Sequence, residues 1–425
     1  MQNRVFVINK DKKPLMPCHP ARARELLTKG EAAVWRRFPF TIILKKDTTK
    51  ETQPVQLGID PGSRKTGMSL ISFNQRGPRV IFGCEIEHKG LRVKKLLEKR
   101  CSSRSSRRNR KTRYRQPRFS NRTKPKDWIA PSLRSRIDNV TQWTSRFQRL
   151  CPLYSIAVEV VKFDMHKLQG TQYQQGTLQG YNIREYLLEK FNRTCVYCKK
   201  KNIPLQIEHI VPKSRDGSNQ LNNLAIACER CNQKKCAKTA AEFGFPGIQE
   251  KVKRPLRDAA AVNTTRKFLF EALKDFKIPV DKGTGYQTKY NRSVNKYPKG
   301  HWVDAACVGA LGSDVYLDPA LQCLEIKAMG RGSRQMCRVD KNGFPRTKAK
   351  TRLKNIKGFQ TGDLVKAIIT KGKKVGTYVG RLSCRTRGSF DIVTSKGKVS
   401  GINHKHCHLL QQADGYQYNH ASSSD

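Results

Sequence analysis

The sequence predicts a multidomain protein of mixed structure, α/β in its largest part and α+β in its smaller units. Its 425 residues exceed one ordinary domain of about 150 residues and suggest two or three. Strand-like and helix-like apolar segments alternate between residues 55 and 311, which is typical of an α/β core. Short strand-like runs broken by glycine fill residues 359–411, which favours a small β-barrel at the end.

The net charge is the most unusual global property of the chain. It has 85 Lys and Arg residues against 33 Asp and Glu residues, a formal net charge of +52. Such an excess repels itself unless a polyanion screens it, and nucleic acid is the obvious partner. A basic tail would be a simpler explanation, but the positive residues are spread along the chain. No basic amphipathic helix with a clean apolar face favours a membrane surface, and no apolar run of about 18 residues predicts a spanning helix.

The first segment, residues 1–52, predicts a small α+β unit. Val5 to Ile8 read as a strand, and a helix over residues 21–29 is stopped by Gly30. Two further strand-like runs follow, at residues 32–35 and 41–44.

The next segment predicts the beginning of the core. Turn residues divide 55–88 into three apolar strands, which favours an antiparallel meander, and a helix over 133–150 and a strand over 154–161 follow. Between these parts, residues 89–126 carry 17 Lys and Arg residues and a single acid, Glu98. Because a helix with charge on every face has no core to join, this segment is either a flexible linker or a phosphate-binding helix.

The remaining segments alternate between polar stretches and stretches whose apolar residues recur with the spacing of a helix or strand. Residues 169–181 are rich in Gln, Gly and Tyr and are interpreted as a linker, residues after about 326 form a second basic stretch, and residues 412–425 are expected to be a frayed tail. Helices are predicted over 183–191, 258–276 and 301–311, with a strand near 278–280.

Four of the 14 cysteines form two pairs with the spacing of a metal site. Each pair is a Cys-x-x-Cys turn, and basic residues flank both: Cys195, Cys198, Cys228 and Cys231. Two such turns can complete a tetrahedron of thiolates around one structural Zn²⁺, whereas a single turn could be a redox pair or a coincidence. The first ten residues carry charge too early for a signal peptide, and the other cysteines are scattered, which indicates reduced thiols in a cytosol.

Acidic residues amid apolar segments predict a first candidate site. Asp60 and Glu159 each end an apolar strand, and Asp304 lies three residues after His301 on one face of a predicted helix. An acid in such surroundings is costly unless it meets a cation. If the three acids converge on one sheet edge, they can hold two Mg²⁺ ions suited to phosphodiester hydrolysis. The order of strands and final helix matches a ribonuclease-H-like fold, although any one of these acids alone would more often be a cap or a surface charge.

A histidine between the two cysteine pairs predicts a second candidate site. Glu208 and His209 precede Asn223 and Asn232 within this module, which is expected to be a small ββα unit stapled by zinc. A neutral imidazole can take a proton from water near pH 7, and a neighbouring carboxylate can hold one Mg²⁺ on the phosphate. A lone histidine would more often be a core or zinc residue, but four cysteines already complete the zinc site.

These motifs resemble known nucleases. Glu208-His209 with Asn223 and Asn232 between zinc knuckles resembles an HNH nuclease, and Gly58-Ile59-Asp60-Pro61-Gly62, Glu159 and His301-Trp302-Val303-Asp304-Ala305 resemble a RuvC nuclease split in three. An HNH module inserted between the second and third RuvC pieces, with an Arg-rich helix after the first, resembles the IscB family of transposon-encoded, RNA-guided nucleases related to the type II CRISPR effector. The motif Pro14-Leu15-Met16-Pro17 matches that family's PLMP domain.

The resemblance implies a role for each matching residue. Asp60, Glu159 and Asp304 would bind the RuvC magnesium ions, with His301 beside them. His209 would be the HNH base, Glu208 and Asn232 would hold its Mg²⁺, and Asn223 would orient the histidine. Family members often have Asp before the catalytic His, where this chain has Glu208. The guide RNA, called ωRNA, would contact a set of basic side chains of the Arg-rich helix: Arg100, Arg104, Arg107, Arg108, Arg110, Lys111, Arg113 and Arg115.

The resemblance also implies an organisation and a working complex. The expected parts are a PLMP domain (1–52), RuvC part I (53–88), the Arg-rich bridge helix (89–126), RuvC part II (127–168), linker and HNH domain (169–247), RuvC part III (248–325) and a C-terminal domain that contacts RNA and the target-adjacent motif (326–425). HNH would cut the guide-paired strand of double-stranded DNA and RuvC the displaced strand. The expected state is a monomer within a ribonucleoprotein in the bacterial cytoplasm, associated with the nucleoid. A guide-free, structure-specific nuclease and a non-cleaving nucleic-acid-binding repressor are the alternatives.

Overall fold

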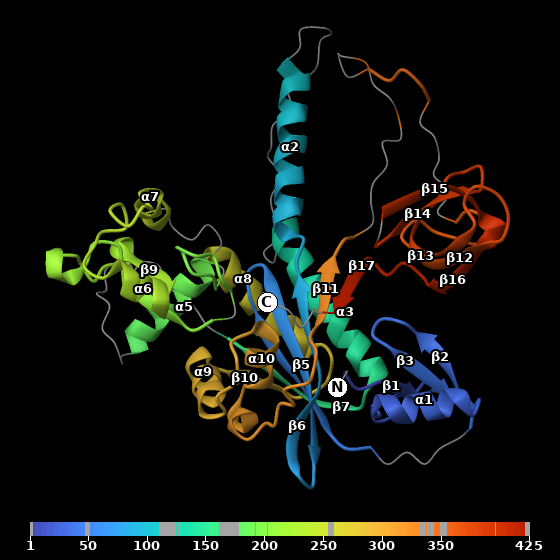
Figure 1. Ribbon diagram of the computed structural model, residues 1–425, viewed down its shortest axis with the longest axis horizontal. Helices are drawn as coiled ribbons and strands as arrows, with labels where there is room; N and C mark the ends of the chain where they lie inside the picture. The colour runs from blue at the N-terminus through green and yellow to red at the C-terminus, as the bar shows by residue number, and fades with distance from the viewer. Residues whose placement is uncertain are drawn as a thin grey trace.

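The centre of the protein is a seven-stranded mixed sheet in the order β10-β7-β4-β5-β6-β11-β17 (Figure 1). The computed structural model describes residues 3–46, 52–109, 125, 128–160, 178–191, 193–201, 203–253, 259–330, 337, 340, 344–348, 355–395 and 397–420. The strands of this sheet are β4 (Val55–Pro61), β5 (Lys65–Asn74), β6 (Gly77–Glu87), β7 (Leu153–Glu159), β10 (Val280–Gly283), β11 (Leu324–Ala328) and β17 (Tyr416–His420).

The pairing directions confirm the expected meander and add strands to both sides of it. Strands β4, β5 and β6 pair antiparallel in chain order. On one side, β7 pairs parallel with β4 and β10 pairs parallel with β7. On the other side, β11 runs parallel to β6, and β17 pairs antiparallel with β11. The expectation of a frayed tail over 412–425 is therefore wrong for β17, which is stabilised by ladder hydrogen bonds to a strand about 90 residues earlier.

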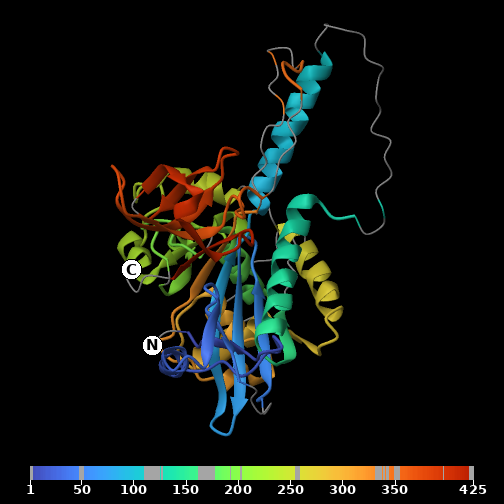
Figure 2. The ribbon, with the colours of Figure 1, turned by 90° about the vertical axis from the view of Figure 1, so that its right-hand side faces the viewer.

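Helices cover the two faces of this sheet. Helix α3 (Pro131–Leu150) packs with α8 (Ala259–Lys274) on one face, where Trp143 and Phe147 are fully buried. The short helix α10 (His301–Ala306) lies on the opposite face. Strand alternation explains the division, because Met68 and Leu70 of β5 join the first core while Ser69 Oγ donates to the carbonyl of Trp302 at 2.5 Å. Figure 2 shows α3 and α8 side by side against the sheet.

Two smaller units adjoin the core. One precedes β4 in the chain, and the other lies between β11 and β17. The first contains β1 (Phe6–Ile8), α1 (Pro20–Thr28), β2 (Ala32–Arg36) and β3 (Thr41–Leu44), in a three-stranded sheet of order β1-β3-β2, as the sequence predicts. The second is a five-stranded antiparallel sheet in the order β15-β14-β13-β12-β16 around the buried Phe390. Its strands are β12 (Leu364–Ile369), β13 (Gly376–Ser383), β14 (Ser389–Thr394), β15 (Gly397–Asn403) and β16 (Cys407–Gln411).

The cysteine module is a separate hydrophobic cluster. It contains α5 (Leu178–Lys190), the hairpin of β8 (Leu205–His209) and β9 (Leu224–Cys228), α6 (Glu229–Lys235) and α7 (Gly247–Lys253), with 3₁₀ turns at Lys213–Arg215 and Leu221–Asn223. The hairpin followed by α6 is the expected ββα unit. The linker expected over 169–181 is wrong at its end, because residues 178–181 already belong to α5, and residues 169–177 lie outside the described part.

The basic segment begins with a long helix, α2 (Gly90–Asn109), which projects away from the body (Figure 1, Figure 2). Residues 110–124 lie outside the described part. The helix expected over 301–311 ends earlier, at Ala306, and a 3₁₀ turn at Ala310–Ser313 follows Gly309, which has a positive φ of 90°. The helix α9 (Gly285–Val294) precedes it, and a last 3₁₀ turn covers His404–His406. Within the described part of the chain, no helix has the length and apolar character to cross a bilayer.

Candidate nuclease centres

Parallel pairing brings Asp60 and Glu159 to the same edge of the central sheet. Ile59 of β4 lies opposite Val158 of β7, so that the next residue of each strand is an acid. Both carboxylates are buried. The sequence expectation that these two acids share one sheet edge is therefore met by the strand register.

Glycines in the sheet allow α10 to lie against this edge. A Cβ atom on Gly58 would come within 1.9 Å of the carbonyl oxygen of Ala305, and one on Gly67 within 1.9 Å of the carbonyl oxygen of His301. Real Cβ atoms do not approach backbone atoms so closely. The backbone of α10 therefore rests directly on β4 and β5, and this contact carries His301 and Asp304 to the acidic edge, here called the acid centre.

Asp60 and His301 form a buried ion pair in the acid centre. The Nδ1 atom of His301 lies 2.6 Å from Oδ2 of Asp60. Burial by itself raises the pKa of Asp60, but His301, with Arg193 and Arg266 behind it, outweighs burial and lowers the pKa below its usual range. The same pair acts in reverse on the imidazole, since burial lowers the pKa of His301 and Asp60 raises it above its usual value.

Glu159 and Asp304 are held by arginines. Arg266 Nη2 lies 3.7 Å from Oε1 of Glu159. Arg292 Nε lies 2.7 Å from Oδ1 of Asp304, and Arg193 Nη1 lies 3.1 Å from its Oδ2. Burial raises the pKa of both acids, and the nearby Asp60 raises it further, most clearly for Glu159.

One acid and several cations of this centre carry no sequence motif. The side chain of Glu185 of α5 is 13% exposed. It lies 3.7 Å from Arg193 and 3.9 Å from Lys299, and it interacts electrostatically with Asp60 and Glu159. Its only signal in the sequence is an acid between the apolar residues Ile183 and Tyr186 of a helix. Arg193 joins the acid centre from the segment just before Cys195, so the approach to the cysteine module and the core meet here.

The donor chemistry of the acid centre fits Mg²⁺, since carboxylate oxygens are its preferred ligands. The pKa values of Glu159 and Asp304 are raised partly because other carboxylates lie near them. A divalent cation at this place would stabilise their ionised forms. Their arrangement differs from a completed metal site, however. Among the described residues, the only group of three or more metal-ligating side chains with all donor atoms within 4.8 Å of one another is the four-cysteine cluster. The arginines and His301 neutralise the acids in this state of the protein.

The four cysteines fit a structural Zn²⁺. Cys195, Cys198, Cys228 and Cys231 converge with their sulfurs within 4.8 Å, and the Sγ atoms of Cys198 and Cys228 are 3.8 Å apart. About 3.8 Å is the separation expected between sulfurs at about 2.3 Å from one tetrahedral zinc ion. Burial opposes ionisation, but the backbone N–H of Lys200 and the neighbouring thiols lower the pKa of Cys198 to about 7, towards the thiolate form that binds metal.

The structure places Glu208 differently from the expectation of a magnesium ligand. Its Oε1 atom lies 2.6 Å from Nζ of Lys235, and Tyr197 donates its hydroxyl to Oε2 at 2.8 Å. The side chains of Glu208 and Lys235 are only 1% and 3% exposed. The expected magnesium ligand Glu208 is therefore a buried carboxylate paired with Lys235.

The ring of His209 is oriented by Asn219. Its Nε2 atom lies 2.8 Å from Oδ1 of Asn219, a residue without a sequence-predicted role. Asn223, expected to orient the ring, instead binds the backbone, because its Nδ2 donates to the carbonyls of Val211 and Ser218 while its Oδ1 accepts from the N–H of Val211. Asn223 therefore fixes the loop that follows His209. The expectation that Asn223 orients the imidazole ring is not met, because Asn219 contacts the ring instead.

Asn232 lies on α6 beside the same strand. Its Nδ2 donates to Oε1 of Gln206 at 3.1 Å, two residues before Glu208 on one face of β8. Burial lowers the pKa of His209, and Lys213 and Lys235 lower it further, which keeps the imidazole neutral near pH 7. This centre thus combines a neutral histidine, a half-buried amide and a zinc-type cysteine cluster.

The basic helix displays its described arginines to solvent. Arg100, Arg104 and Arg108 are exposed and spaced by four residues, so they lie along one side of α2. The side chain of Arg107 and the residues Arg110, Lys111, Arg113 and Arg115 lie outside the described part of the chain.

Comparisons with known proteins identify an HNH endonuclease domain. Residues 195–246 match the HNH endonuclease family model, and residues 5–177 match the model described as RRXRR protein. The HNH match supports a nuclease domain in the cysteine module. No match was found among curated proteins.

Among solved structures, the chain is similar to Cas9 of Streptococcus thermophilus. The complexes with the GGAA and AGAA PAM each share 11% identity, over 60% of this chain and 32% of theirs, with TM-scores of 0.22 and 0.20. The chain thus spans about a third of the length of these structures. No function follows from a likeness at this level.

Proposed function

We propose that this protein is an RNA-guided DNA endonuclease of the IscB type, with an HNH centre and a RuvC-type centre that cut different strands. One observation carries the proposal. The HNH domain is inserted in the chain between Glu159 and Asp304, two acids that the central sheet and α10 bring into one buried centre. Two separate candidate centres in one chain suit the cutting of two strands.

The strand order supports a ribonuclease-H-like assignment for the core. An antiparallel meander, β6-β5-β4, is extended by the parallel strands β7 and β10, and the acids lie where β4 and β7 end. Asp60, Glu159 and Asp304 are the residues that would hold two Mg²⁺ ions, with His301 beside them. Magnesium held there would supply activation of water and stabilisation of the leaving oxygen.

At the HNH centre, His209 is proposed as the general base. In the tautomer whose Nε2–H donates to Asn219, the lone pair of Nδ1 can accept a proton from water. Its lowered pKa keeps this lone pair available at neutral pH. Asn232 and Glu208 would hold one Mg²⁺ only if Glu208 exchanges its ion pair with Lys235 for the metal.

The charge and the projecting helix support a guide RNA as partner. A net charge of +52 needs a polyanion, and α2 presents exposed arginines along one side rather than an apolar face. We propose ωRNA as this partner, a double-stranded DNA target with an adjacent motif as substrate, and a monomeric protein within a ribonucleoprotein of the bacterial nucleoid.

The test is purification of the full chain from cells that also express the proposed ωRNA, followed by sequencing of the bound RNA. The complex is then incubated with Mg²⁺ and a plasmid that carries the sequence complementary to the guide. We expect a defined, structured RNA and cleavage only of the matching plasmid. Equal cleavage after RNA removal would favour a guide-free nuclease, and binding without cleavage would favour a repressor.

A further inference from the structure

The outer face of α9 presents an apolar stripe to solvent. Tyr286, Tyr290 and Val294 are 58%, 59% and 54% exposed. Their spacing of four residues places them along one side of the helix. The opposite side carries Gly285, Thr288 and Asn291, which are buried. The stripe is therefore not part of the hydrophobic core, and core packing does not account for its composition.

Amide hydrogen bonds hold α9 rigidly from its inner side. Asn291 Nδ2 donates to the carbonyls of Cys307 and Gly309, both at 2.9 Å. Asn295 Nδ2 donates to the carbonyl of Ser313 at 2.6 Å. Because the segment after α10 accepts these bonds, the stripe has a fixed position relative to His301 and Asp304.

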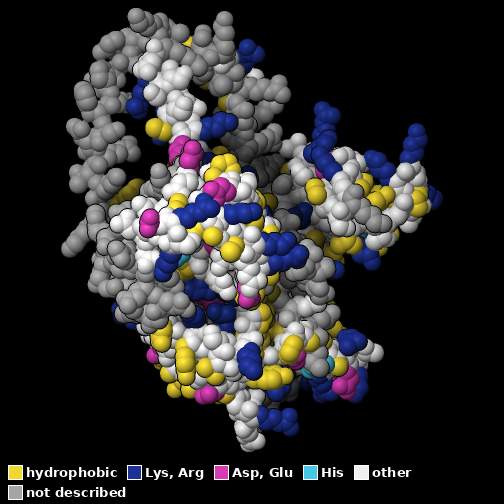
Figure 3. Space-filling model, turned by 60° about the vertical axis from the view of Figure 1, so that its left-hand side comes forward, with side chains coloured by type: hydrophobic (Ala, Val, Ile, Leu, Met, Phe, Trp, Pro, Cys, Tyr) yellow, Lys and Arg dark blue, Asp and Glu magenta, His cyan; other side chains and the backbone are white. Residues whose placement is uncertain are grey.

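The stripe begins next to the acid centre. Gly283 of β10 lies opposite Glu159 of β7, and α9 starts two residues later with Gly285. From the inner side of the same helix, Arg292 reaches Asp304 at 2.7 Å. Figure 3 shows hydrophobic side chains gathered on the lower part of this face, below a hollow where Lys and Arg side chains gather.

Positive charge surrounds the acids at this point. Among the described residues, the cations that interact with Asp60, Glu159, Glu185 or Asp304 include, besides His301, Arg184, Arg193, Arg266, Arg292, Lys289 and Lys299. Lys289 also lies on α9 itself, between Tyr286 and Tyr290 in sequence. Exposed aromatic rings beside clustered cations are the combination with which proteins bind single-stranded nucleic acid, since bases stack on the rings while cations attract the backbone.

We propose that Tyr286, Tyr290 and Val294 form a stacking surface for unpaired bases of a single DNA strand whose backbone enters the acid centre. A duplex keeps its base faces stacked inside, so the surface selects an unwound strand. A protein partner fits less well, because the neighbouring side chains are cationic. The inference rests on the proposed function to the extent that the acid centre cuts this strand.

The first test maps the contact without requiring cleavage. The full chain is mixed with a single-stranded oligodeoxynucleotide containing 5-iodouracil, in chelator, and irradiated. Stacked iodouracil crosslinks to aromatic side chains, so we expect crosslinks in tryptic peptides 283–289 and 290–292, which contain Tyr286 and Tyr290. The same crosslinks are expected for Asp60→Ala. Crosslinks to duplex DNA of equal yield, to RNA instead of DNA, or only to other peptides would overturn the proposal.

The second test measures nicking of the strand assigned to the acid centre. Tyr286→Ala/Tyr290→Ala should raise KM at least about 5-fold, the smallest effect expected from losing stacking on one base, with kcat little changed. Tyr286→Phe/Tyr290→Phe should retain the normal KM, because the rings remain. Tyr154→Ala is the matched control, since this tyrosine is 66% exposed at the opposite end of β7 from Glu159.

The two tests separate failure of the stacking surface from failure of the nuclease assignment. Nicking that depends on Asp60 but is normal in the double alanine variant, without crosslinks to α9, would exclude the stacking surface alone. Crosslinks to α9 in a protein whose nicking never depends on Asp60 would leave the stacking surface standing and reject the acid centre as the cutting site.

Discussion

The two centres differ in how much of the chain is needed to build them. Cys195 to Lys235 supply the metal cluster, His209, Glu208 and its lysine partner within 41 residues, counted inclusively. The acid centre needs β4, β7, α5, α8 and α10, which are spread from Asp60 to Asp304. The HNH centre can therefore form locally, whereas the acid centre exists only when the whole sheet is assembled.

The centres also differ in the origin of the cation that pairs with each acid. Lys235 comes from the same module as Glu208. Arg193, by contrast, comes from the segment leading into the HNH module and pairs with Asp304 of the core. The acid centre therefore depends on where the HNH module lies. Among the described contacts, Lys299 of the core pairs with Glu185 of the module's α5, whereas Glu208 and His209 take their partners from the module itself. The comparison teaches that one centre is self-contained and the other is coupled to its neighbour.

The largest expected effect is the loss of one centre alone when zinc is removed. Cys195→Ser or Cys228→Ser should release the metal and unfold the HNH module, because structural zinc supplies roughly 10–16 kcal/mol in small modules. Nicking at the acid centre should persist, because Arg292 of α9 still pairs with Asp304 when Arg193 is displaced. Zinc content and end-labelled strand cleavage measure both results. Cys236→Ser is the control, since Cys236 lies outside the cluster; full zinc and normal cutting of both strands in Cys195→Ser would contradict a self-contained HNH site.

The second prediction separates the two chemistries. His209→Ala removes the base of the HNH centre and should slow its cut by about 10²–10⁴-fold, leaving nicks in the strand assigned to RuvC. Asp60→Ala removes the partner of His301 and should leave nicks only in the guide-paired strand. Plasmid targets with each strand end-labelled report both. A double-strand break at the normal rate from either variant would mean that the two centres do not divide the strands.

The third prediction concerns the contact between sheet and α10, which only the acid centre needs. Gly67→Ala places a Cβ atom against the carbonyl of His301 and should displace α10, with a loss of acid-centre nicking of at least the size expected for Asp60→Ala. Gly247→Ala meets open space and is the matched control. Zinc content and guide-paired strand cutting should stay normal in both variants. Normal cutting of both strands by Gly67→Ala would show that α10 does not need this close approach.

The fourth prediction sharpens the contrast between the two ion pairs. Lys235→Met leaves Glu208 buried without its cation and should destabilise the HNH module by about 3–5 kcal/mol. Arg193→Met should cost less, because Arg292 still pairs with Asp304. Local hydrogen exchange of β8 and β9 measures the first effect, and exchange of β4 and α10 the second. Equal loss of protection at both places would contradict the expectation that losing Lys235 costs more local stability than losing Arg193.

The smallest expected effect lies outside both centres, on α2. Neutralising Arg100, Arg104 and Arg108 by substitution with Gln should weaken RNA binding and reduce the log–log salt slope by about 2–3, at about 0.7–0.9 for each phosphate contact. Fluorescence anisotropy over a salt series measures the slope. Cleavage by complexes saturated with RNA should change little. An unchanged slope would mean that this side of α2 faces solvent in the complex.

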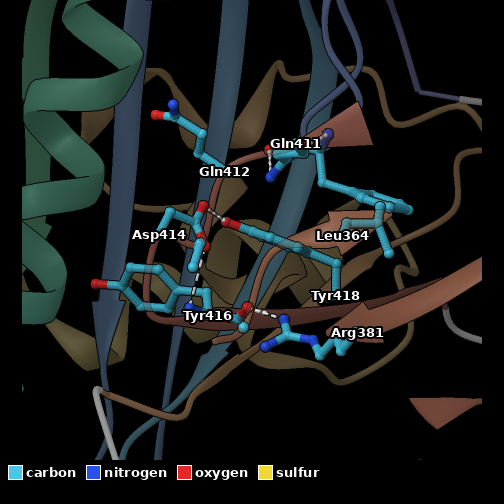
Figure 4. A pocket seen from close by; sticks show the side chains of 10 residues that line it. Leu364, Arg381, Gln411, Gln412, Asp414, Tyr416 and Tyr418 are labelled. Atoms are coloured by element: carbon cyan, nitrogen blue, oxygen red, sulfur yellow. Dashed lines mark hydrogen bonds between the residues drawn. The ribbon is translucent and has the colours of Figure 1, made fainter. Parts of the chain in front are cut away.

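A cavity of about 60 Å³ lies at the junction of the C-terminal unit and the core (Figure 4). The contacts of its lining residues hold parts of the fold together. Tyr418 stacks on Phe38 with ring centroids 5.2 Å apart, and Asp414 pairs with Arg36 and, at 3.2 Å, with Arg146. These contacts join the N-terminal unit, α3 and the returning strand β17, which explains how the last strand of the chain is fixed in the central sheet.

The sequence by itself determined what depends on near neighbours in the chain. The cysteine pairs, the ββα hairpin, the meander over 55–88 and the helix at 133–150 follow from spacing, turn residues and apolar periodicity, which act over a few residues. Only the tertiary structure decided the rest. The ladder of β17 with β11, the arginines at Glu159 and Asp304, the inward turn of Glu208 and the part played by Glu185 all join residues that no local pattern links. The physical reason is that a buried charge takes whichever counter-charge the assembled fold brings near, and that partner is set by packing rather than by sequence separation.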